Sequence, residues 1–356
     1  MCKKALIAMS GGVDSSVAAF LTKQAGYDCV GVTMRLVQNE DIGAGRERAC
    51  CSLDDVEDAR SVARRLGIPY YVFNFSGDFK VQVIERFAAA YESGGTPNPC
   101  IDCNRYLKFD RLFQRARALG CGTVATGHYA RIEIQSGRYV LKKALDKSKD
   151  QSYVLYMLTQ EQLAHIRFPL GELSKAEARS IAEAQGFCNS EKPDSQDICF
   201  IPDGDYAAFL EQYTGKSYPT GDILDLSGQV IGKHLSAIRY TIGQRKGLGL
   251  SLHQPVYVCR KDMAANTVTV GPEQSLYSRE LWADDVNWIA IDHLSAPMRV
   301  HAKIRYRQAE QPSTVYPDES GKIRLLFDKP QRAVTAGQAV VLYDGDTVVG
   351  GGTICP

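Results

Sequence analysis

The sequence lacks the features that mark a membrane, fibrous or strongly charged protein. No apolar run approaches the roughly 18 residues that a membrane-spanning helix needs, and the apolar stretch near the first residue is too short for a signal peptide with its cleavage site. Lysine and arginine total 42 against 41 aspartates and glutamates, a net charge of +1, which excludes an acidic tail or a wholesale polycation. We therefore expect a cytoplasmic protein without membrane contact, and 356 residues predict two or three domains.

Two common nucleotide-binding motifs are also absent. Gly215-Lys216-Ser217 imitates the end of a Walker loop, but the position where that motif begins is Leu210 rather than glycine. No Gly-x-Gly-x-x-Gly fingerprint is present either. The sequence therefore excludes a Walker-type mononucleotide site and a dinucleotide site of the Gly-x-Gly-x-x-Gly type.

Strand and helix patterns alternate in the first half of the chain. An apolar run ends at Ser10-Gly11-Gly12 and leads into a helical pattern that stops near Gly26. Further strand patterns occupy 29–36, 70–75 and 123–126, and further helical patterns occupy 53–66, 79–91 and 104–119. This alternation predicts an α/β fold with a parallel sheet covered on both faces.

The second half changes to short β-branched runs separated by glycine, proline and aspartate turns. Strand patterns occupy 256–258, 267–270, 300–306, 323–327 and 339–343. We expect a catalytic domain over 1–210, a small central β-containing domain over 211–273 and a C-terminal β domain over 274–356.

The segment Ser10–Ser16 lies where an open parallel sheet binds ligands, between the carboxyl end of a strand and the start of a helix. Glycine amides, serine hydroxyls and the helix dipole favour a phosphate group there. Asp14 would repel that phosphate unless it holds a metal ion or a key hydrogen bond, so its position indicates Mg²⁺ with a nucleotide. The segment resembles the loop of the ATP pyrophosphatases (the PP-loop superfamily), which cleave ATP between the α and β phosphates and adenylate a carbonyl oxygen.

Cysteine is unusually frequent, with eleven residues in a chain for which we expect a reducing compartment. Cys100 and Cys103 form a C-x2-C pair after two prolines, at the start of a basic helical pattern. The helix start, Arg105 and Lys108 should lower the pKa of such a thiol and make it reactive. Cys199 lies far downstream, between apolar residues near the expected domain boundary.

Taken together, several segments resemble the bacterial tRNA-specific 2-thiouridylases, which place sulfur on C2 of the wobble uridine. The resemblance spans nearly the whole chain and implies a PP-loop domain, a small central domain and a C-terminal β-barrel. The matching segments are 9–16, 96–99, 103–104 with 108–109, 125–129, 149–153, 198–201, 240–249, 305–308 and 350–352.

The resemblance also implies roles for individual residues. ATP would contact Ala8, Met9, Ser10, Gly11, Gly12, Val13, Asp14, Ser15, Met34 and Gly127. The tRNA would contact Asn98, Pro99, Cys100, His128, Lys149, Asp150, Gln151, Arg305, Tyr306 and Gln338. The catalytic residues would be Cys199, which carries a persulfide, and Cys103, which attacks it and leaves a Cys103–Cys199 disulfide. A sulfur donor, either a cysteine desulfurase or a sulfur-relay carrier, would reload Cys199.

Cys100 leaves the sulfur chemistry open. The best-known family members carry aspartate at this position, whereas here Cys100, Cys103 and Cys199 offer three thiolates, which suit a [4Fe–4S] cluster with one open iron. A second alternative is a four-cysteine zinc site formed by this C-x2-C pair with Cys50 and Cys51, although adjacent cysteines lack the usual spacing.

Local charge favours tRNA as the partner. Residues 229–261 contain six lysines and arginines and no acid. The wobble base, flipped from the anticodon stack, would then reach ATP and Cys199. Two rival functions are another PP-loop ligase acting on a small metabolite, and a tRNA-binding iron–sulfur sensor without turnover.

Overall fold

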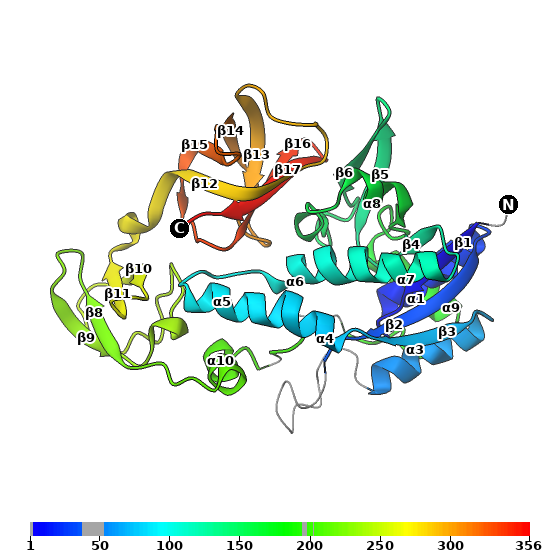
Figure 1. Cartoon of the computed structure of the whole chain (residues 1–356), viewed down its shortest axis with the longest axis horizontal. Helices are drawn as coiled ribbons and strands as arrows, with labels where there is room; N and C mark the ends of the chain where they lie inside the picture. Colours follow the sequence, from blue (N-terminus) through cyan, green and yellow to red (C-terminus); the bar gives the residue numbers. More distant parts are fainter. Residues whose placement is uncertain (1–2, 38–52, 194–197, 202) are drawn as a thin grey trace.

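The N-terminal part of the protein is built on a parallel sheet, seen at the right of Figure 1. The computed structural model describes residues 3–37, 53–193, 198–201 and 203–356. Within these ranges the sheet has five strands in the order β3-β2-β1-β4-β7. Their bounds are β1 (Lys4–Ala8), β2 (Asp28–Arg35), β3 (Tyr70–Asn74), β4 (Thr123–Ala125) and β7 (Ile166–Arg167).

Apolar side chains project from both faces of this sheet. In β1, Leu6 packs into one buried cluster, whereas Ala5 and Ile7 pack into another. The second cluster is covered by α1 (Val13–Gln24), α3 (Leu53–Arg65) and α9 (Lys175–Ala184). The predicted parallel sheet with two covered faces is thereby confirmed.

Two long helical segments and one shorter helix cover the other face. The first long segment joins α4 (Ser76–Phe79), a π-helical stretch (Lys80–Glu85) and α5 (Arg86–Glu92). The second joins α6 (Pro99–Asp102), a π-helical stretch (Cys103–Arg111) and α7 (Leu112–Ala118), and α10 (Tyr206–Thr214) completes the layer. In the described part of the chain, no helix is long and apolar enough to cross a bilayer.

The second helical segment starts earlier than the sequence predicts. Asn98 caps it by accepting a hydrogen bond from the Cys100 amide at 3.1 Å, and Pro99 occupies the first helical position. The helix therefore begins at Pro99 rather than near Asn104, and Cys100 and Cys103 lie in its first turns.

The C-terminal part is a closed β-barrel, shown in yellow, orange and red in Figure 1. Its strands follow the order β12-β15-β14-β13-β16-β17, and β17 pairs back onto β12. The bounds are β12 (Tyr277–Trp288), β13 (Met298–Lys303), β14 (Gln311–Pro317), β15 (Ile323–Arg332), β16 (Ala339–Asp344) and β17 (Thr347–Ile354), with a 3-10 turn at Glu273–Leu276.

A hairpin from the first half of the chain extends the barrel sheet. This hairpin consists of β5 (Ala130–Gln135) and β6 (Arg138–Lys143), and β6 pairs with β17 at Lys142 and Thr347. The segment 152–158 and α8 (Gln160–His165) pack between the hairpin and the barrel, with a 3-10 turn at Ser152–Val154. This hairpin was not among the strands predicted from the sequence.

The central part forms a small sheet of its own, at the left of Figure 1. Its strand order is β10-β11-β8-β9, with β8 (Gly221–Leu224), β9 (Val230–His234), β10 (Tyr257–Asp262) and β11 (Thr267–Gly271). A 3-10 turn at Ala237–Arg239 contributes to its separate apolar cluster. A central β-containing part was predicted and is confirmed.

Candidate active site

The turn between β1 and α1 is held in shape by its own serines. Ser15 Oγ donates to the Gly12 carbonyl at 3.0 Å and accepts from the Ser10 amide at 3.1 Å. Ser16 Oγ also bonds the Gly12 carbonyl at 3.1 Å. These bonds hold the turn at a helix N-terminus, where the dipole and the free amides favour an anion.

Two glycines allow other backbones to approach this turn. Gly11 has φ +79°, and a β-carbon there would lie 2.3 Å from the carbonyl oxygen of Asp55 in α3. A β-carbon on Gly127, which follows β4, would lie 2.7 Å from the Asp14 carbonyl carbon. Two of the three predicted ATP-contacting glycines, Gly11 and Gly127, thus lie where only glycine fits, whereas a β-carbon on Gly12 would lie 3.6 Å from Ser10 Oγ, an ordinary contact.

Asp14 has two donors in the protein itself. Its Oδ1 accepts from the Tyr129 hydroxyl at 2.8 Å and from Lys175 Nζ at 2.7 Å. Tyr129 is in turn fixed by Gln151, whose side chain accepts from the Tyr129 amide at 2.9 Å. The negative charge that the sequence placed beside a phosphate site is therefore balanced by Lys175, and sequence reasoning missed this lysine.

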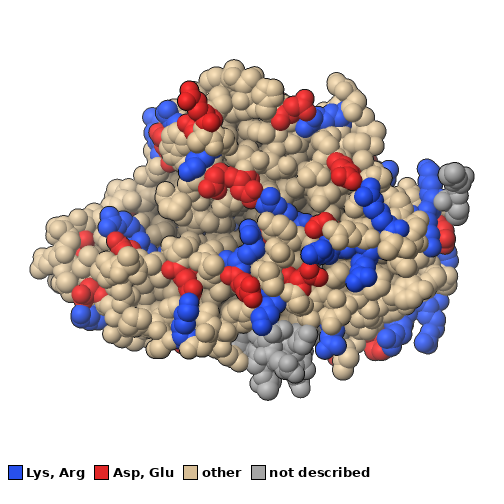
Figure 2. Space-filling view, viewed as in Figure 1, with Lys and Arg blue, Asp and Glu red and all other residues tan. Residues whose placement is uncertain are grey.

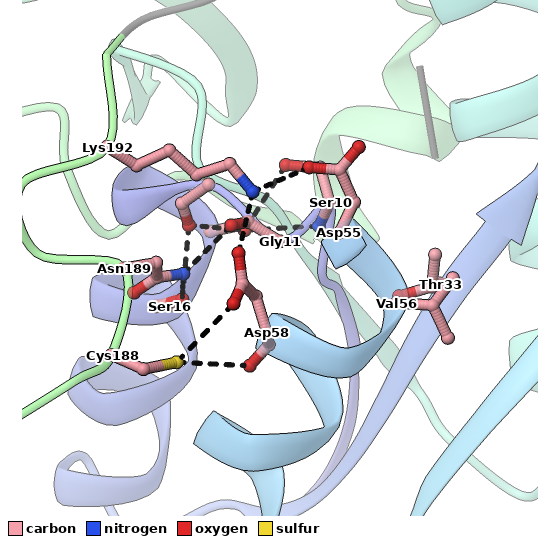
Figure 3. A network of polar contacts seen from close by, with 12 residues as sticks. Ser10, Gly11, Ser16, Thr33, Asp55, Val56, Asp58, Cys188, Asn189 and Lys192 are labelled. Atoms are coloured by element: carbon pink, nitrogen blue, oxygen red, sulfur yellow. Dashed lines mark hydrogen bonds and ion pairs between the residues drawn. The ribbon is translucent and has the colours of Figure 1, made fainter. Parts of the chain in front are cut away.

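The segment 188–192 also packs against the turn, as Figure 3 shows. The buried Asn189 donates to the Gly11 carbonyl and to Ser16 Oγ, both at 2.9 Å. Lys192 Nζ lies 2.7 Å from Asp55 Oδ1 and 2.6 Å from Asp58 Oδ2. No motif in the sequence points to these contacts, because they join segments far apart in the chain.

The sulfur-bearing residues share an apolar cluster with part of the predicted ATP site. Cys103 is buried in the cluster that contains Met34, and Ala8 and Cys199 pack against it. Phe200, next to Cys199, is almost fully buried. Its ring packs edge-on against Phe79 and Phe87, with centroid distances of 5.6 and 5.4 Å. Cys103 and the distant Cys199 segment thus meet on the sheet face that β1 and β2 also line.

The three cysteines do not form a metal-binding group. Cys100 is exposed whereas Cys103 is buried, and in the ranges that the structure describes no three His, Cys, Asp or Glu side chains could hold a metal ion together. The residues as placed do not fit a [4Fe–4S] cluster. Cys50 and Cys51, invoked for a zinc site, lie outside the described residues.

The loop 94–98 is fastened to the barrel. Gln338 Nε2 donates to the Thr96 carbonyl, and the Thr96 amide donates to the Ala336 carbonyl at 2.9 Å. The next residues are Asn98, the buried Pro99 and the exposed Cys100. The predicted base-contacting residues therefore start a helix whose entry is fixed by the C-terminal barrel.

A second contact joins the barrel to the loop 149–151. The Tyr306 hydroxyl donates to the Asp150 carbonyl at 3.3 Å, and the Asp150 carboxylate accepts from the Ser152 hydroxyl at 2.8 Å. Arg305 donates to the Ala333 carbonyl at 2.8 Å. The Tyr306 side chain is partly exposed, but desolvation of its hydroxyl raises the tyrosine pKa, and the nearby charges of Asp150 and Cys100 raise it further.

His128 lies inside the protein. The residue is 7% exposed, and its ring bonds the Thr126 hydroxyl at 2.7 Å and packs beside Phe109 and Phe168. Burial, with a smaller effect of the Lys108 charge, holds its pKa well below the usual value. In this conformation His128 is a neutral interior residue, and its predicted contact with tRNA remains a prediction.

Much of the basic run 229–261 is already paired. Lys233 pairs with Asp222, Arg239 with Glu211 at 3.5 Å and Arg260 with Asp262 at 4.0 Å, all acids outside the run. Lys261 Nζ is buried, and burial lowers its pKa to about 8. On the side of the molecule drawn in Figure 2, acidic and basic side chains are interspersed. The local excess of charge is smaller than the sequence count indicates.

Three family models together cover nearly the whole chain. A tRNA methyl transferase HUP domain matches residues 3–203, a tRNA methyl transferase PRC-barrel domain matches 207–272, and an aminomethyltransferase β-barrel domain matches 278–354. These matches agree with a parallel-sheet domain followed by two β domains.

Curated relatives match over the full length. The chain is 51% identical to tRNA-specific 2-thiouridylase MnmA of Clostridioides difficile (strain 630), covering 99% of this chain and 98% of that protein. It is 52% identical to the protein of the same name from Symbiobacterium thermophilum, covering 99% and 92%.

Among solved structures, a 4-thiouridine synthetase–RNA complex with bound ATP matches at 18% identity over 60% of this chain and 50% of that one, with a TM-score of 0.34. The NMN synthetase from Francisella tularensis gives the same identity and TM-score over 60% and 78%.

Proposed function

The chain belongs to the tRNA-specific 2-thiouridylase family, and we propose that it is a tRNA-uridine 2-sulfurtransferase that uses ATP. The observation that carries this proposal is an identity of about half the residues over 99% of the chain. The family-model descriptions name methyl transfer, but the full-length relatives name thiolation. The hydrogen-bonded turn at Ser10–Ser16, of the kind that binds phosphate, and the packing of Cys103 and Cys199 in one apolar cluster also support thiolation.

In the first step, the turn at Ser10–Ser15 would hold the phosphates of ATP. The uridine O2 attacks the α-phosphate, diphosphate leaves, and O2 becomes part of an AMP leaving group. The amides at the start of α1 would stabilise the charge on the phosphates. Asp14, whose side chain is 31% exposed, supplies the carboxylate that Mg²⁺ prefers, and a bound Mg²⁺ would help to neutralise the diphosphate.

In the second step, the outer sulfur of a Cys199 persulfide would add to C2, and AMP would depart. The base is then joined to Cys199 through a sulfur–sulfur bond. The Cys103 thiolate attacks Cys199 Sγ, which releases 2-thiouridine and forms a Cys103–Cys199 disulfide. An external thiol reduces this disulfide, and a persulfide-carrying donor protein reloads Cys199. The packing of both cysteines on one cluster supports this route.

The barrel and the central domain would position the tRNA. Gln338 of the barrel bonds the loop before the helix start at Asn98–Cys100, and Tyr306 of the barrel bonds the Asp150 carbonyl. Because Tyr306 also lies near Cys100, one bound anticodon would contact Tyr306 and this helix start together. His128 and Lys149 remain proposed tRNA contacts, together with the other residues of the family set. We also propose the domain boundaries near 210 and 273.

The test is incubation of the full chain with ATP, Mg²⁺, a sulfur source and unmodified tRNA, followed by mass spectrometry of the nucleosides. We expect 2-thiouridine with wild type and none with Cys199→Ala. A methylated uridine, or thiolation that persists in Cys199→Ala, would contradict the proposal.

A further inference from the structure

Lys192 belongs to the segment 188–192, which contacts both α3 and the turn between β1 and α1. The proposed mechanism gives this lysine no role. Its ammonium group contacts the carboxylates of Asp55 and Asp58, one turn apart on α3, as Figure 3 shows. Asp55 is also the residue whose backbone faces Gly11 of the proposed ATP turn. The Asp55 backbone is therefore next to the place where phosphates would bind, and both carboxylates meet at Lys192, three residues from Asn189, which bonds the same turn.

Two carboxylates beside an anion site are unfavourable unless a cation balances them. Each negative charge close to the turn would repel the phosphates of ATP, and the partly buried setting leaves this repulsion only partly screened. Lys192 Nζ is at hydrogen-bond distance from both acids, and its side chain is 30% exposed. Burial lowers the Lys192 pKa, but the bonds and charges of Asp55 and Asp58 outweigh burial and leave the pKa above its usual value.

Asn189 fixes the same segment to the turn. Its side chain is 3% exposed and donates to both Gly11 and Ser16. The segment that holds Lys192 therefore cannot move away without breaking two buried hydrogen bonds at the turn itself.

We propose that Lys192 is a positioning residue for ATP, which neutralises Asp55 and Asp58 so that the adjacent turn accepts the phosphates. This role rests on the proposed function, since it requires that the turn binds ATP. Lys192 acts through the two carboxylates and takes no part in the sulfur chemistry.

The test measures the affinity of the full chain for α,β-methylene-ATP with Mg²⁺ by titration calorimetry. We expect Lys192→Met to bind about tenfold more weakly, equivalent to about 1.4 kcal/mol, and Lys192→Arg to bind nearly as wild type does. The triple variant Asp55→Asn, Asp58→Asn, Lys192→Met has neither the cation nor the two charges, so its affinity should return to that of wild type.

The triple variant separates electrostatic from purely structural action. If Lys192 only tied the segment down, the triple variant would bind as weakly as Lys192→Met, and that result would overturn the proposal. Equal affinity of Lys192→Met and wild type would also overturn it. Failure of folded wild type to bind the analogue would instead contradict the proposed function.

Lys142 provides a matched control. It also bridges two carboxylates, Glu133 and Asp346, both at 3.2 Å, but it lies in the hairpin β5–β6. Lys142→Met should keep wild-type affinity for the analogue, and a comparable loss of affinity in it would contradict a specific role for Lys192. Thermal melting of each variant confirms that the protein measured is folded.

Discussion

Gly127 lies directly against Asp14: a β-carbon on Gly127 would come within 2.7 Å of the Asp14 carbonyl carbon and of the Ser15 amide nitrogen. Both contacts are with backbone at the first turn of α1, which packs against β1 and cannot move independently. The end of β4 is therefore fitted to the start of the helix that would bind ATP.

Gly127→Ala should push this helix start away from β4. We expect a loss of about 1–3 kcal/mol in the free energy of unfolding, because the added methyl group meets backbone rather than a flexible side chain. Affinity for ATP should fall as well. Gly122→Ala, at the other end of β4, has nothing within 4 Å of its added carbon and should change neither quantity. Equal behaviour of the two variants in denaturant titration would contradict this prediction.

The buried His128 should make stability depend on pH. Its folded-state pKa is well below the unfolded value of about 6.5, so the unfolded chain binds the proton more readily. Above about pH 6.5, the contribution of His128 to the free energy of unfolding should not change with pH. It should then fall with decreasing pH, by at most about 1.4 kcal/mol per pH unit. Urea titrations from pH 7 to about pH 5 would measure this slope. His128→Gln should have a shallower slope, and an unchanged slope would show that another group is responsible.

Gln338→Ala should loosen the loop that leads into the Cys100 helix. The variant loses the hydrogen bond to the Thr96 carbonyl, which is worth about 1 kcal/mol, so the KM for tRNA should rise about fivefold. ATP affinity should remain at the wild-type value, because Gln338 does not touch the turn at Ser10–Ser16. Gln114→Ala, an exposed glutamine that pairs only with neighbours on its own helix, is the control. A rise in the KM for ATP, with the KM for tRNA unchanged, would contradict a role of Gln338 in tRNA binding.

Cys103→Ser should trap the intermediate in which the base is joined to Cys199. Without the second thiol, the sulfur–sulfur bond between base and protein is not resolved, so one turnover should yield a covalent protein–tRNA adduct. Gel electrophoresis without reductant would detect the adduct, and a reductant should release the tRNA. Cys259→Ser, in the central sheet, should give no adduct. Full turnover by Cys103→Ser under these conditions would exclude the disulfide route.

The turn at Ser10–Ser16 and the sheet around it were predictable because their signals are local. A short apolar run, a Ser-Gly-Gly turn and a helical pattern specify strand, turn and helix within two dozen residues. Likewise Asn98 and Pro99 are a recognisable helix start, although the basic pattern beyond Asn104 led the predicted boundary too far downstream.

The partners of these local features were not predictable. Lys175 and Lys192 reach Asp14, Asp55 and Asp58 only after the chain has folded, and no spacing in the sequence encodes such pairs. The hairpin β5–β6 was missed for a similar reason. Its charged side chains are held by the distant Asp346 and Asp292, and no spacing in the sequence indicates these pairs.

Because the hairpin β5–β6 shares a sheet and a core with the barrel, the catalytic part of the chain cannot complete its structure alone. Tyr153 and Leu141 pack with Val341 and Tyr343, and Lys143 bonds the backbone near residue 346. A chain emerging from the ribosome must therefore release its last strands before the edge of β6 is covered. Until then that edge is open to pairing with other chains. Pairing of β17 with β6 therefore closes an edge at which the newly made chain would otherwise aggregate.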